Sequence, residues 1–441
     1  MTAKYFNITT LFILLNGIVL SQDINNEDST LENGSLQNCI NYAISHQPSI
    51  QQSLLDEEIA DHEILGKLAD WFPQLNLNIN LTHNYKLPTT IFQGNPTKVG
   101  LLNTSAAEFS LTQTIFDRDV FLAASTSKDI RKLTKQKTTF SKIDVVTIVS
   151  KAFYSVLFTQ EQIALLEEDI IRLQQSVKDT YNQYKGGIVD KTDYQRASIA
   201  LNNAQAELKQ NQELLKERFA FLKEQMGYPS NSDFNIVFDK NKMQNEIFVD
   251  TTQNINYESR IEYQLLQTEI SLRQANLSYN DLSFVPSISA FANYTYFFQN
   301  DKLSKLYNTN NPNSNIGLLL SFPIFQGGKR IQEIEAASLE VKRYSYDMIS
   351  LKDSINTQYI SVLGQYKSCL YNYNILKTNL ELANDVYNTI QLQYKSGIKT
   401  YLEVITSETD LRTTQANYNN ALFQLLSSKL DVQRALGTIQ Y

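Results

Sequence analysis

Two long stretches without proline constrain this chain more than any other feature. Proline is absent from Asp117 to Gly227 and from Gly327 to Gly437, and glycine inside these spans is confined to one Tyr-Lys-x-Gly sequence in each, except for Gly364. Because proline and glycine interrupt helices, each span predicts a long helix followed by a shorter one. The long helix, of roughly 67 residues at about 1.5 Å per residue, measures about 100 Å. That length excludes an ordinary globular core.

Apolar side chains recur at every seventh residue within these spans. The series in the long helices are Val149, Val156, Ile163, Ile170, Val177 and Tyr184, and Tyr359, Tyr366, Tyr373, Leu380, Tyr387 and Tyr394. The shorter helices continue the spacing with Leu201, Leu208, Leu215 and Leu222, and with Leu411, Tyr418, Leu425 and Val432. A seven-residue repeat keeps one seam against a neighbouring helix, as in a coiled coil. A soluble coiled coil or helical bundle would explain the helices, but not the segments between them.

The chain carries an internal duplication. Tyr184-Lys185-Gly186-Gly187-Ile188 reappears as Tyr394-Lys395-Ser396-Gly397-Ile398, and the same offset aligns Met226-Gly227 with Leu436-Gly437. Nearby offsets align Ile115-Phe116 with Ile324-Phe325 and Trp71-Phe72-Pro73 with Phe284-Val285-Pro286. Four landmarks in one order make chance similarity a poor explanation. The two halves therefore predict two copies of one structural unit.

Four segments before the long helices alternate between apolar and polar residues. The apolar positions are Leu75, Leu77, Ile79 and Leu81; Phe109, Leu111 and Ile115; Ile288, Ala290, Ala292, Tyr294 and Tyr296; and Ile316, Leu318, Leu320, Phe322 and Ile324. A period of two over about ten residues is typical of strands in outer-membrane barrels. A sheet packed on a soluble core is the alternative, but helices of this length cannot cover its apolar face. We expect Leu75, Leu77, Ile79, Leu81, Leu318, Leu320 and Phe322 to face lipid, and Lys86–Ala106 and Phe297–Ser314 to be exposed loops.

Four strands cannot close a membrane barrel, because an open edge leaves backbone groups unpaired in lipid and single-chain barrels begin at eight strands. Three chains with twelve strands are the simplest cyclic solution that leaves an aqueous lumen. We therefore expect an α+β membrane protein, in which a homotrimeric 12-stranded β-barrel, four strands per protomer, continues into a long α-helical periplasmic barrel.

Composition and the N-terminus narrow the function. Lys4 followed by the apolar run Ile8–Leu20 predicts a signal peptide over residues 1–21, with a buried or amphipathic first helix as the alternative. This run is too short to span a membrane, and no other long apolar stretch is evident. A net charge of -7 without a basic run argues against nucleic acid. Three His and two Cys offer little for metal or acid-base chemistry, and the pairing of Cys39 with Cys369 stays open.

At this point the chain resembles the TolC-type outer-membrane efflux proteins over essentially its whole mature length. The resemblance rests on Leu36-Gln37-Asn38-Cys39-Ile40-Asn41-Tyr42-Ala43 with Gln47-Pro48, on Pro323-Ile324-Phe325-Gln326-Gly327-Gly328, and on the two Tyr-x-x-Gly turns, each followed six residues later by a carboxylate. It implies a trimeric tube in the outer membrane and periplasm, with a mixed belt to which Tyr228–Asn256 contributes. The family includes outer-membrane factors of tripartite efflux and type I secretion systems.

The expected organisation follows the duplication. A signal peptide (1–21) precedes a first repeat (22–227), a linker (228–256) and a second repeat (257–441). Each repeat begins with a helix; the hairpins are expected at about 74–116 and 286–325, the long helices at about 117–183 and 327–394, and the shorter helices at about 190–226 and 400–436.

The helix turns are the candidate functional site. Gly187 and Gly397 permit the left-handed backbone of a helix reversal, and Asp193 and Glu403 follow each turn. In a trimer these acids form rings that favour cations or close the pore, whereas solvated acids favoured by a helix N-terminus are the alternative. The resemblance implies a gate at Asp193, Tyr394, Lys399 and Glu403; Thr406 replaces a second acid, which puts a doubled ring in doubt.

The resemblance also implies docking to a periplasmic adaptor (membrane fusion protein) and, through it, to an inner-membrane pump. The candidates are Lys185, Gly187, Ile188, Val189, Gly397, Ile398 and Thr400; exposed turn residues without a partner are the alternative. Gly327-Gly328-Lys329-Arg330 lacks the spacing of a phosphate-binding loop. We expect no enzyme, cofactor or metal, but a channel for passive exit of drugs, metal ions or proteins. The alternative is a secreted structural or adhesive coiled-coil oligomer without channel activity.

Overall fold

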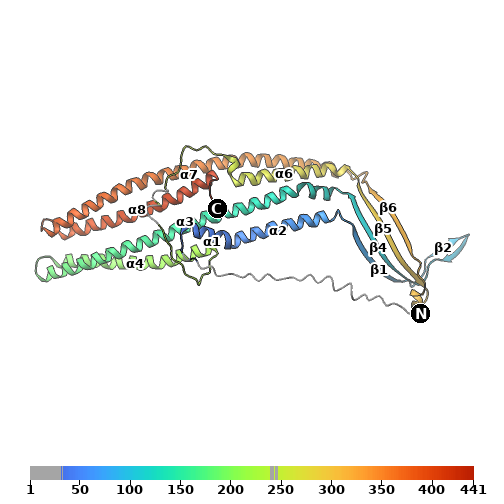
Figure 1. Cartoon of the computed structure of the whole chain (residues 1–441), viewed down its shortest axis with the longest axis horizontal. Helices are drawn as coiled ribbons and strands as arrows, with labels where there is room; N and C mark the ends of the chain where they lie inside the picture. The colour runs from blue at the N-terminus through green and yellow to red at the C-terminus, as the bar shows by residue number, and fades with distance from the viewer. Residues whose placement is uncertain (1–30, 32, 239–242, 244–246) are drawn as a thin grey trace.

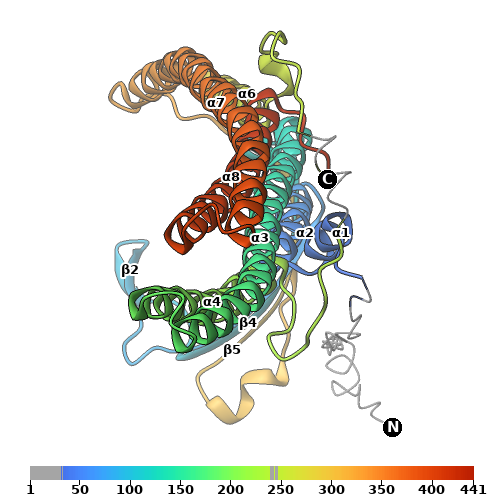
Figure 2. The same ribbon diagram turned by 90° about the vertical axis from the view of Figure 1, so that its left-hand side faces the viewer.

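The computed structural model describes Leu31, residues 33–238, Met243 and residues 247–441. The molecule is elongated: a sheet lies at one end, paired helices lie at the other, and the C-terminus lies near mid-length (Figure 1). Viewed along the long axis, α7, α8, α3 and α4 follow one another around an arc (Figure 2). The expected signal peptide at 1–21 lies outside the described residues.

The helices repeat in the same order in both halves. The first half contains α1 (Leu36–His46), α2 (Pro48–Ala69), the 68-residue α3 (Arg118–Lys185) and the 36-residue α4 (Lys191–Met226). The second contains α6 (Ile261–Asp281), the 67-residue α7 (Lys329–Lys395) and the 36-residue α8 (Tyr401–Leu436), with short 3-10 turns η3 (Tyr257–Ser259), η4 (Leu282–Phe284) and η5 (Leu303–Asn308). This arrangement is the internal duplication that the sequence predicts.

The sheet joins the two repeats. Its strands are β1 (Gln74–His83), β4 (Asn103–Phe116), β5 (Ser287–Asn300) and β6 (Asn313–Ser321), antiparallel in the order β1-β4-β5-β6. The register places Leu75 opposite Leu111, Leu111 opposite Ala292, and Ala292 opposite Ile316. Because paired residues share a face, most apolar residues of the four strands lie on one face and most asparagines and threonines on the other, with Phe291, Phe297 and Leu319 as apolar exceptions on the polar face.

The loops are shorter than the sequence suggests. Lys86–Ala106 contains a small hairpin of β2 (Thr89–Phe92) and β3 (Asn95–Lys98), and β4 already begins at Asn103. Phe297–Ser314 contains the end of β5, η5 and the start of β6. The reason is side-chain hydrogen bonding: the Asn103 amide donates to the carbonyl oxygens of Asn300 at 3.0 Å and Asp301 at 2.9 Å. The composition of these polar residues indicates a loop, but in the structure they extend the pairing between β4 and β5.

The fourth strand is also shorter than predicted, ending at Ser321 rather than Ile324. Pro323 has no backbone N–H to donate and restricts the residue before it. Phe322 therefore lies beyond the strand, with its ring centroid 5.8 Å from the Arg330 guanidinium.

The main hydrophobic core lies near mid-length, where α1, α3, α4, α7 and α8 meet. Its fully buried side chains include Phe153, Leu222, Met226, Tyr366 and Leu425. The segment after α4 packs on it: the Tyr366 hydroxyl donates to the Ile247 carbonyl at 2.9 Å and accepts from the Val249 N–H at 3.0 Å. Cys39 and Cys369 are both free and buried in this core.

One helix is more apolar than the sequence reading recognised. α3 contains an 18-residue window that is long and apolar enough to cross a membrane, but 56% of that window is buried inside the protein. Its apolar side chains pack against the neighbouring helices, including Phe158 against Phe423 of α8 with ring centroids 5.9 Å apart. Packing in the helical layer thus accounts for this composition.

Candidate functional site

Both long helices end in the same reversal at the end of the molecule opposite the sheet (Figure 1). After α3, the Ile188 N–H donates to the Gln183 carbonyl at 2.9 Å and the Gly187 N–H to that of Tyr184 at 3.0 Å. The equivalent bonds after α7 join Ile398 to Gln393 at 2.9 Å and Gly397 to Tyr394 at 2.9 Å. This is the Schellman arrangement, which requires a left-handed residue, and Gly187 and Gly397 have φ of 73° and 74°.

The turn residues expected to dock an adaptor are mostly exposed. Ile188 and Ile398 have exposed fractions of 76% and 71%. Lys185, Gly187, Gly397 and Thr400 are exposed as well, and Val189 is half-buried. Lys185 Nζ lies 4.8 Å from the centroid of the Tyr181 ring. Each tip thus presents one exposed isoleucine on a hydrogen-bonded turn.

Lys399 and Glu403 form a closed local unit at the start of α8. Glu403 accepts from Lys399 Nζ at 2.5 Å and from the Thr400 backbone N–H at 2.9 Å, completing a capping box. The Lys399 hydrogen bond, aided by the one from Thr400, lowers the Glu403 pKa to about 2. Glu403 is therefore ionised and held against its own helix at neutral pH.

Tyrosines join the two repeats just behind the turns. The Tyr394 hydroxyl of α7 donates to Gln183 Oε1 of α3 at 2.9 Å. Tyr401 Oη of α8 shares a 2.7 Å hydrogen bond with Ser176 Oγ of α3, and its ring centroid is 6.0 Å from that of Tyr394. Burial above all, with smaller contributions from Glu408 and Asp193, raises the Tyr401 pKa to about 12. These contacts hold α7 and α8 against α3.

The remaining predicted residues occupy different positions. Asp193 lies in the first turn of α4 and acts on Tyr401 through its charge. Among the described residues, no hydrogen bond or ion pair joins Asp193 to Glu403. The Thr406 hydroxyl donates to the Leu402 carbonyl at 2.8 Å, within its own helix. The structure thus brings Lys399 to Glu403 and Tyr394 to the other repeat, but leaves Thr406 outside this network.

A buried charge cluster lies two helical turns behind Tyr401, and the sequence reading missed it. Arg172 of α3 forms an ion pair with Asp169 and lies 3.8 Å from Glu408 of α8. Asp169 is 2% exposed and Glu408 9%. Burial raises the Glu408 pKa, and the charges of Arg172 and Arg412 oppose the shift. A sequence signal existed: Glu408 lies between Val404 and Leu411 on the apolar stripe of α8.

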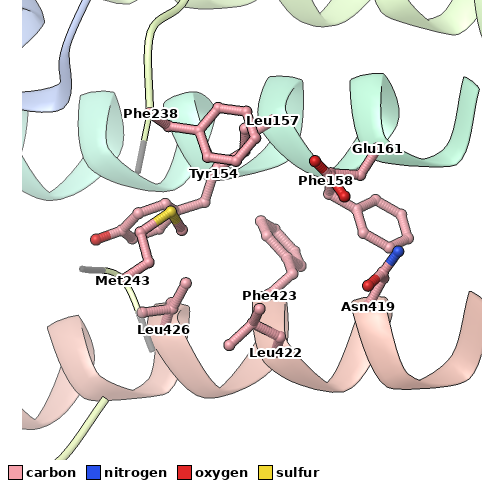
Figure 3. A pocket seen from close by; sticks show the side chains of 10 residues that line it. All are labelled: Tyr154, Leu157, Phe158, Glu161, Phe238, Met243, Asn419, Leu422, Phe423 and Leu426. Carbon is pink, nitrogen blue, oxygen red and sulfur yellow. The ribbon is translucent and has the colours of Figure 1, made fainter. Parts of the chain in front are cut away.

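The α3–α8 seam is closed at the level of the core. Tyr154 and Phe158 of α3 face Leu422 and Phe423 of α8 across a cavity of about 40 Å³, and Met243 lies over it (Figure 3). A space of this size holds about one water molecule. Over the residues that the structure describes, the seam is therefore a packing interface.

The residues predicted to face lipid share the apolar face of the sheet, apart from Phe322. Leu75, Leu77, Ile79, Leu81, Leu318 and Leu320 are all more than half exposed in the single chain. On the opposite face, Gly317 accommodates the Phe291 ring, which would lie 2.7 Å from a Cβ at that position. An uncovered apolar face of this extent requires a nonpolar environment.

Comparison with known proteins matches this architecture. Residues 39–228 and 258–438 match the family model described as "Outer membrane efflux protein". The chain is 22% identical to the outer membrane protein TolC of Escherichia coli (strain K12) over 416 residues, covering 89% of this chain and 80% of that protein. It is 20% identical to the outer membrane protein OprJ of Pseudomonas aeruginosa, covering 93% and 85%.

Solved structures show the same fold. A crystal structure of CusC superposes with a TM-score of 0.75 at 16% identity, covering 91% of each chain. The open-state crystal structure of the MtrE outer membrane channel of Neisseria gonorrhoeae gives 0.72 at 16% identity, covering 91% of this chain and 88% of that one.

Proposed function

Because this chain belongs to the outer membrane efflux protein family, we propose that its channel is a homotrimer that passes substrates from a tripartite efflux or type I secretion machine, and that the helix tips dock an adaptor and gate the pore. The protein is an outer-membrane efflux channel, located in the outer membrane. The trimeric state, the gate at the helix tips and the docking of an adaptor are the features that we propose beyond this role.

The open four-stranded sheet carries the proposal of a trimer. Both outer strands, β1 and β6, pair on one side only, and one face of the sheet is apolar. Unpaired strand edges are not tolerated in lipid, so β1 of one chain pairs with β6 of the next. Three chains close twelve strands around the polar face, which becomes the lumen.

The ion pair at the start of α8 supports the proposal of a gate. Lys399 and Glu403 fix the first turn of α8, while Tyr394 and Tyr401 tie α7 and α8 to α3. Three copies place these groups, with Asp193, around the narrow end of the helical barrel. Opening requires the α7–α8 pair to move away from α3, which breaks the tyrosine hydrogen bonds.

The exposed apolar turns support the proposal of docking. Ile188 and Ile398 stand on reversals of the same geometry, so a trimer presents six similar knobs. A periplasmic adaptor with apolar helix tips would cover them, and the inner-membrane pump binds through that adaptor. We expect Ile188→Asp with Ile398→Asp to abolish co-purification of the adaptor after mild crosslinking.

Single-channel conductance in a planar bilayer tests the gate. We expect Lys399→Ala with Glu403→Ala to raise conductance several-fold, because the start of α8 loses both its ion pair and its cap. The matched control is Lys209→Ala with Glu213→Ala, which removes an exposed ion pair of the same spacing and 2.6 Å length from the middle of α4. Equal conductance in the two double variants would refute the gate; a water-soluble oligomer without conductance would refute the channel.

A further inference from the structure

A polar cavity of about 260 Å³ lies where the sheet meets the long helices, far from the tips. The starts of α3 and α7, the turn η4, the start of β5 and the ends of β4 and β6 enclose it. Its polar lining includes Arg118, Ser283, Ser287, Ser321, Lys329 and Arg330. None of the contacts described for the tips involves this cavity.

Three buried polar atoms of the lining have no hydrogen-bond partner among the residues that the structure describes: Arg118 Nη1, Ser283 Oγ and Arg330 Nη2. Arg330 is only 7% exposed, and its Nε donates to Gln326 Oε1 at 2.9 Å, which fixes the guanidinium. Burying such a donor without a partner costs free energy. Three unsatisfied groups from three separate segments therefore point to a missing acceptor.

Aromatic rings, not carboxylates, position the two arginines. The Arg118 guanidinium lies 4.4 Å from the Tyr279 ring centroid, and that of Arg330 lies 5.2 Å from the Phe284 ring centroid. Within the described part of the chain, neither arginine forms an ion pair. The two acids of the lining contact groups other than the two arginines. Asp117 caps α3 by accepting from the Asp119 N–H at 2.7 Å, and Glu333 lies 3.6 Å from Lys329.

The first turn of α7 adds backbone donors. Gly328 is the N-cap, with φ of 85° and no side-chain cap, and the first turn holds no acidic residue. The Lys329 N–H already donates to the Gln326 carbonyl at 3.1 Å, so the first turn offers the N–H groups of Arg330 and Ile331. The leading N–H groups of a helix have no intrahelical acceptor, and the helix dipole favours an anion there. The Gly-Gly-Lys-Arg sequence alone is no phosphate loop; the fold supplies Arg118 and Ser283 from elsewhere.

We propose that this cavity binds an oxyanion of the phosphate class, held by Arg118, Arg330 and the first turn of α7. It opens on the polar face of the sheet, because Ser287 and Ser321 pair with one another on the face opposite Leu318 and Leu320. The ligand is therefore a soluble phosphate or phosphate-bearing solute and not a lipid headgroup. That this face lines a lumen rests on the proposed function; anion binding itself does not.

Calorimetric titration of the purified full-length chain in detergent with inorganic phosphate tests the site, with chloride at equal ionic strength as the blank. We expect saturable binding that Arg118→Gln and Arg330→Gln each weaken at least tenfold. The control is Arg343→Gln, an exposed arginine of α7 whose guanidinium lies 5.2 Å from the Tyr344 ring centroid, outside the cavity. Circular dichroism checks folding; if Arg330→Gln does not fold, Arg118→Gln decides.

Absence of phosphate binding to the wild-type chain, or equal affinity in all variants, overturns the proposal. A second titration uses dihexanoylphosphatidylglycerol below its micellar concentration. Binding of this lipid without binding of inorganic phosphate overturns the assignment to a soluble ligand. Because no arm reads conductance, failure of the anion site and failure of the proposed channel give different results.

Discussion

Four glycines with almost the same backbone angle should respond very differently to alanine. Gly187 and Gly397 have φ of 73° and 74°, and Gly227 and Gly437 have φ of 67° and 70°. A non-glycine residue in the left-handed region destabilises the folded protein by about 1–2 kcal/mol. Alanine also lowers the conformational entropy of the unfolded chain, which offsets about 0.4–1 kcal/mol of that loss. The conformational cost is thus about 1 kcal/mol at each site.

The surroundings separate the two pairs. At Gly187 and Gly397 an added Cβ meets no described atom within 4 Å, so the conformational cost is the whole cost. At Gly227 it would lie 2.6 Å from the His46 carbonyl oxygen, and at Gly437 2.5 Å from that of Ser259. Backbone must move to relieve such a clash, which adds about 1–3 kcal/mol. We expect about 1 kcal/mol for Gly187→Ala and about 2–4 kcal/mol for Gly227→Ala.

Amide hydrogen exchange read by mass spectrometry on the purified protein measures each turn separately. Exchange at the tip should accelerate roughly fivefold in Gly187→Ala, since about 1.4 kcal/mol corresponds to a factor of ten, and Gly187→Asn should lie closer to wild type because asparagine tolerates this conformation. Gly227→Ala should accelerate exchange in both α1 and the end of α4. Equal effects at tip and core glycines would refute the reasoning.

Three further predictions concern single side chains. In thermal unfolding, Glu408→Gln should stabilise the protein at pH 7, because two buried acids share Arg172; since burial raises the folded-state pKa of Glu408, the gain should shrink once the pH falls below that pKa and vanish only below the unfolded-state pKa, near the ordinary value of 4.5. Tyr366→Phe should cost about 1–3 kcal/mol, because the Ile247 carbonyl and the Val249 N–H lose their buried partner; faster exchange at Val249 checks this. For Glu403, whose pKa is lowered to about 2, the contribution to closure should be complete above the ordinary glutamate pKa of 4.5 and decline progressively as the pH falls from there to about 2; a difference in conductance between wild type and Glu403→Gln that is constant from pH 7 to about 5 and shrinks below it checks this.

Periodicity made the long elements readable from the sequence. The structure has α3 at Arg118–Lys185 and α7 at Lys329–Lys395, against expectations of about 117–183 and 327–394. The seam residues are all buried, because a seven-residue spacing keeps them on the side of the helix that faces its neighbour. They are Leu411, Tyr418, Leu425 and Val432. The spacing of apolar residues within a helix was enough to predict that helix, because this signal depends on no other segment.

Contacts between distant segments were not readable. The ladder at Asn103 depends on carbonyl oxygens of Asn300 and Asp301, and the Arg172–Glu408 contact joins the two repeats. Likewise, Arg118 Nη1 and Arg330 Nη2, which have no hydrogen-bond partner among the described residues, face one cavity because β4 pairs with β5 and β5 with β6. Spacing within a segment carries no information on such pairs.

Disulfide crosslinking between sheet edges tests the closed trimeric barrel most directly. Asn78→Cys on β1 is combined in turn with cysteine at Asn315, Leu319 or Ser321 on β6, which lie on the same face of the sheet as Asn78, and the protein is oxidised in the outer membrane. Because β4 and β5 separate these strands within one chain, any bond joins two chains. The account predicts covalent dimers and a closed trimer as the final product for at least one pair. Monomers throughout, or a ladder continuing beyond three chains, would contradict it.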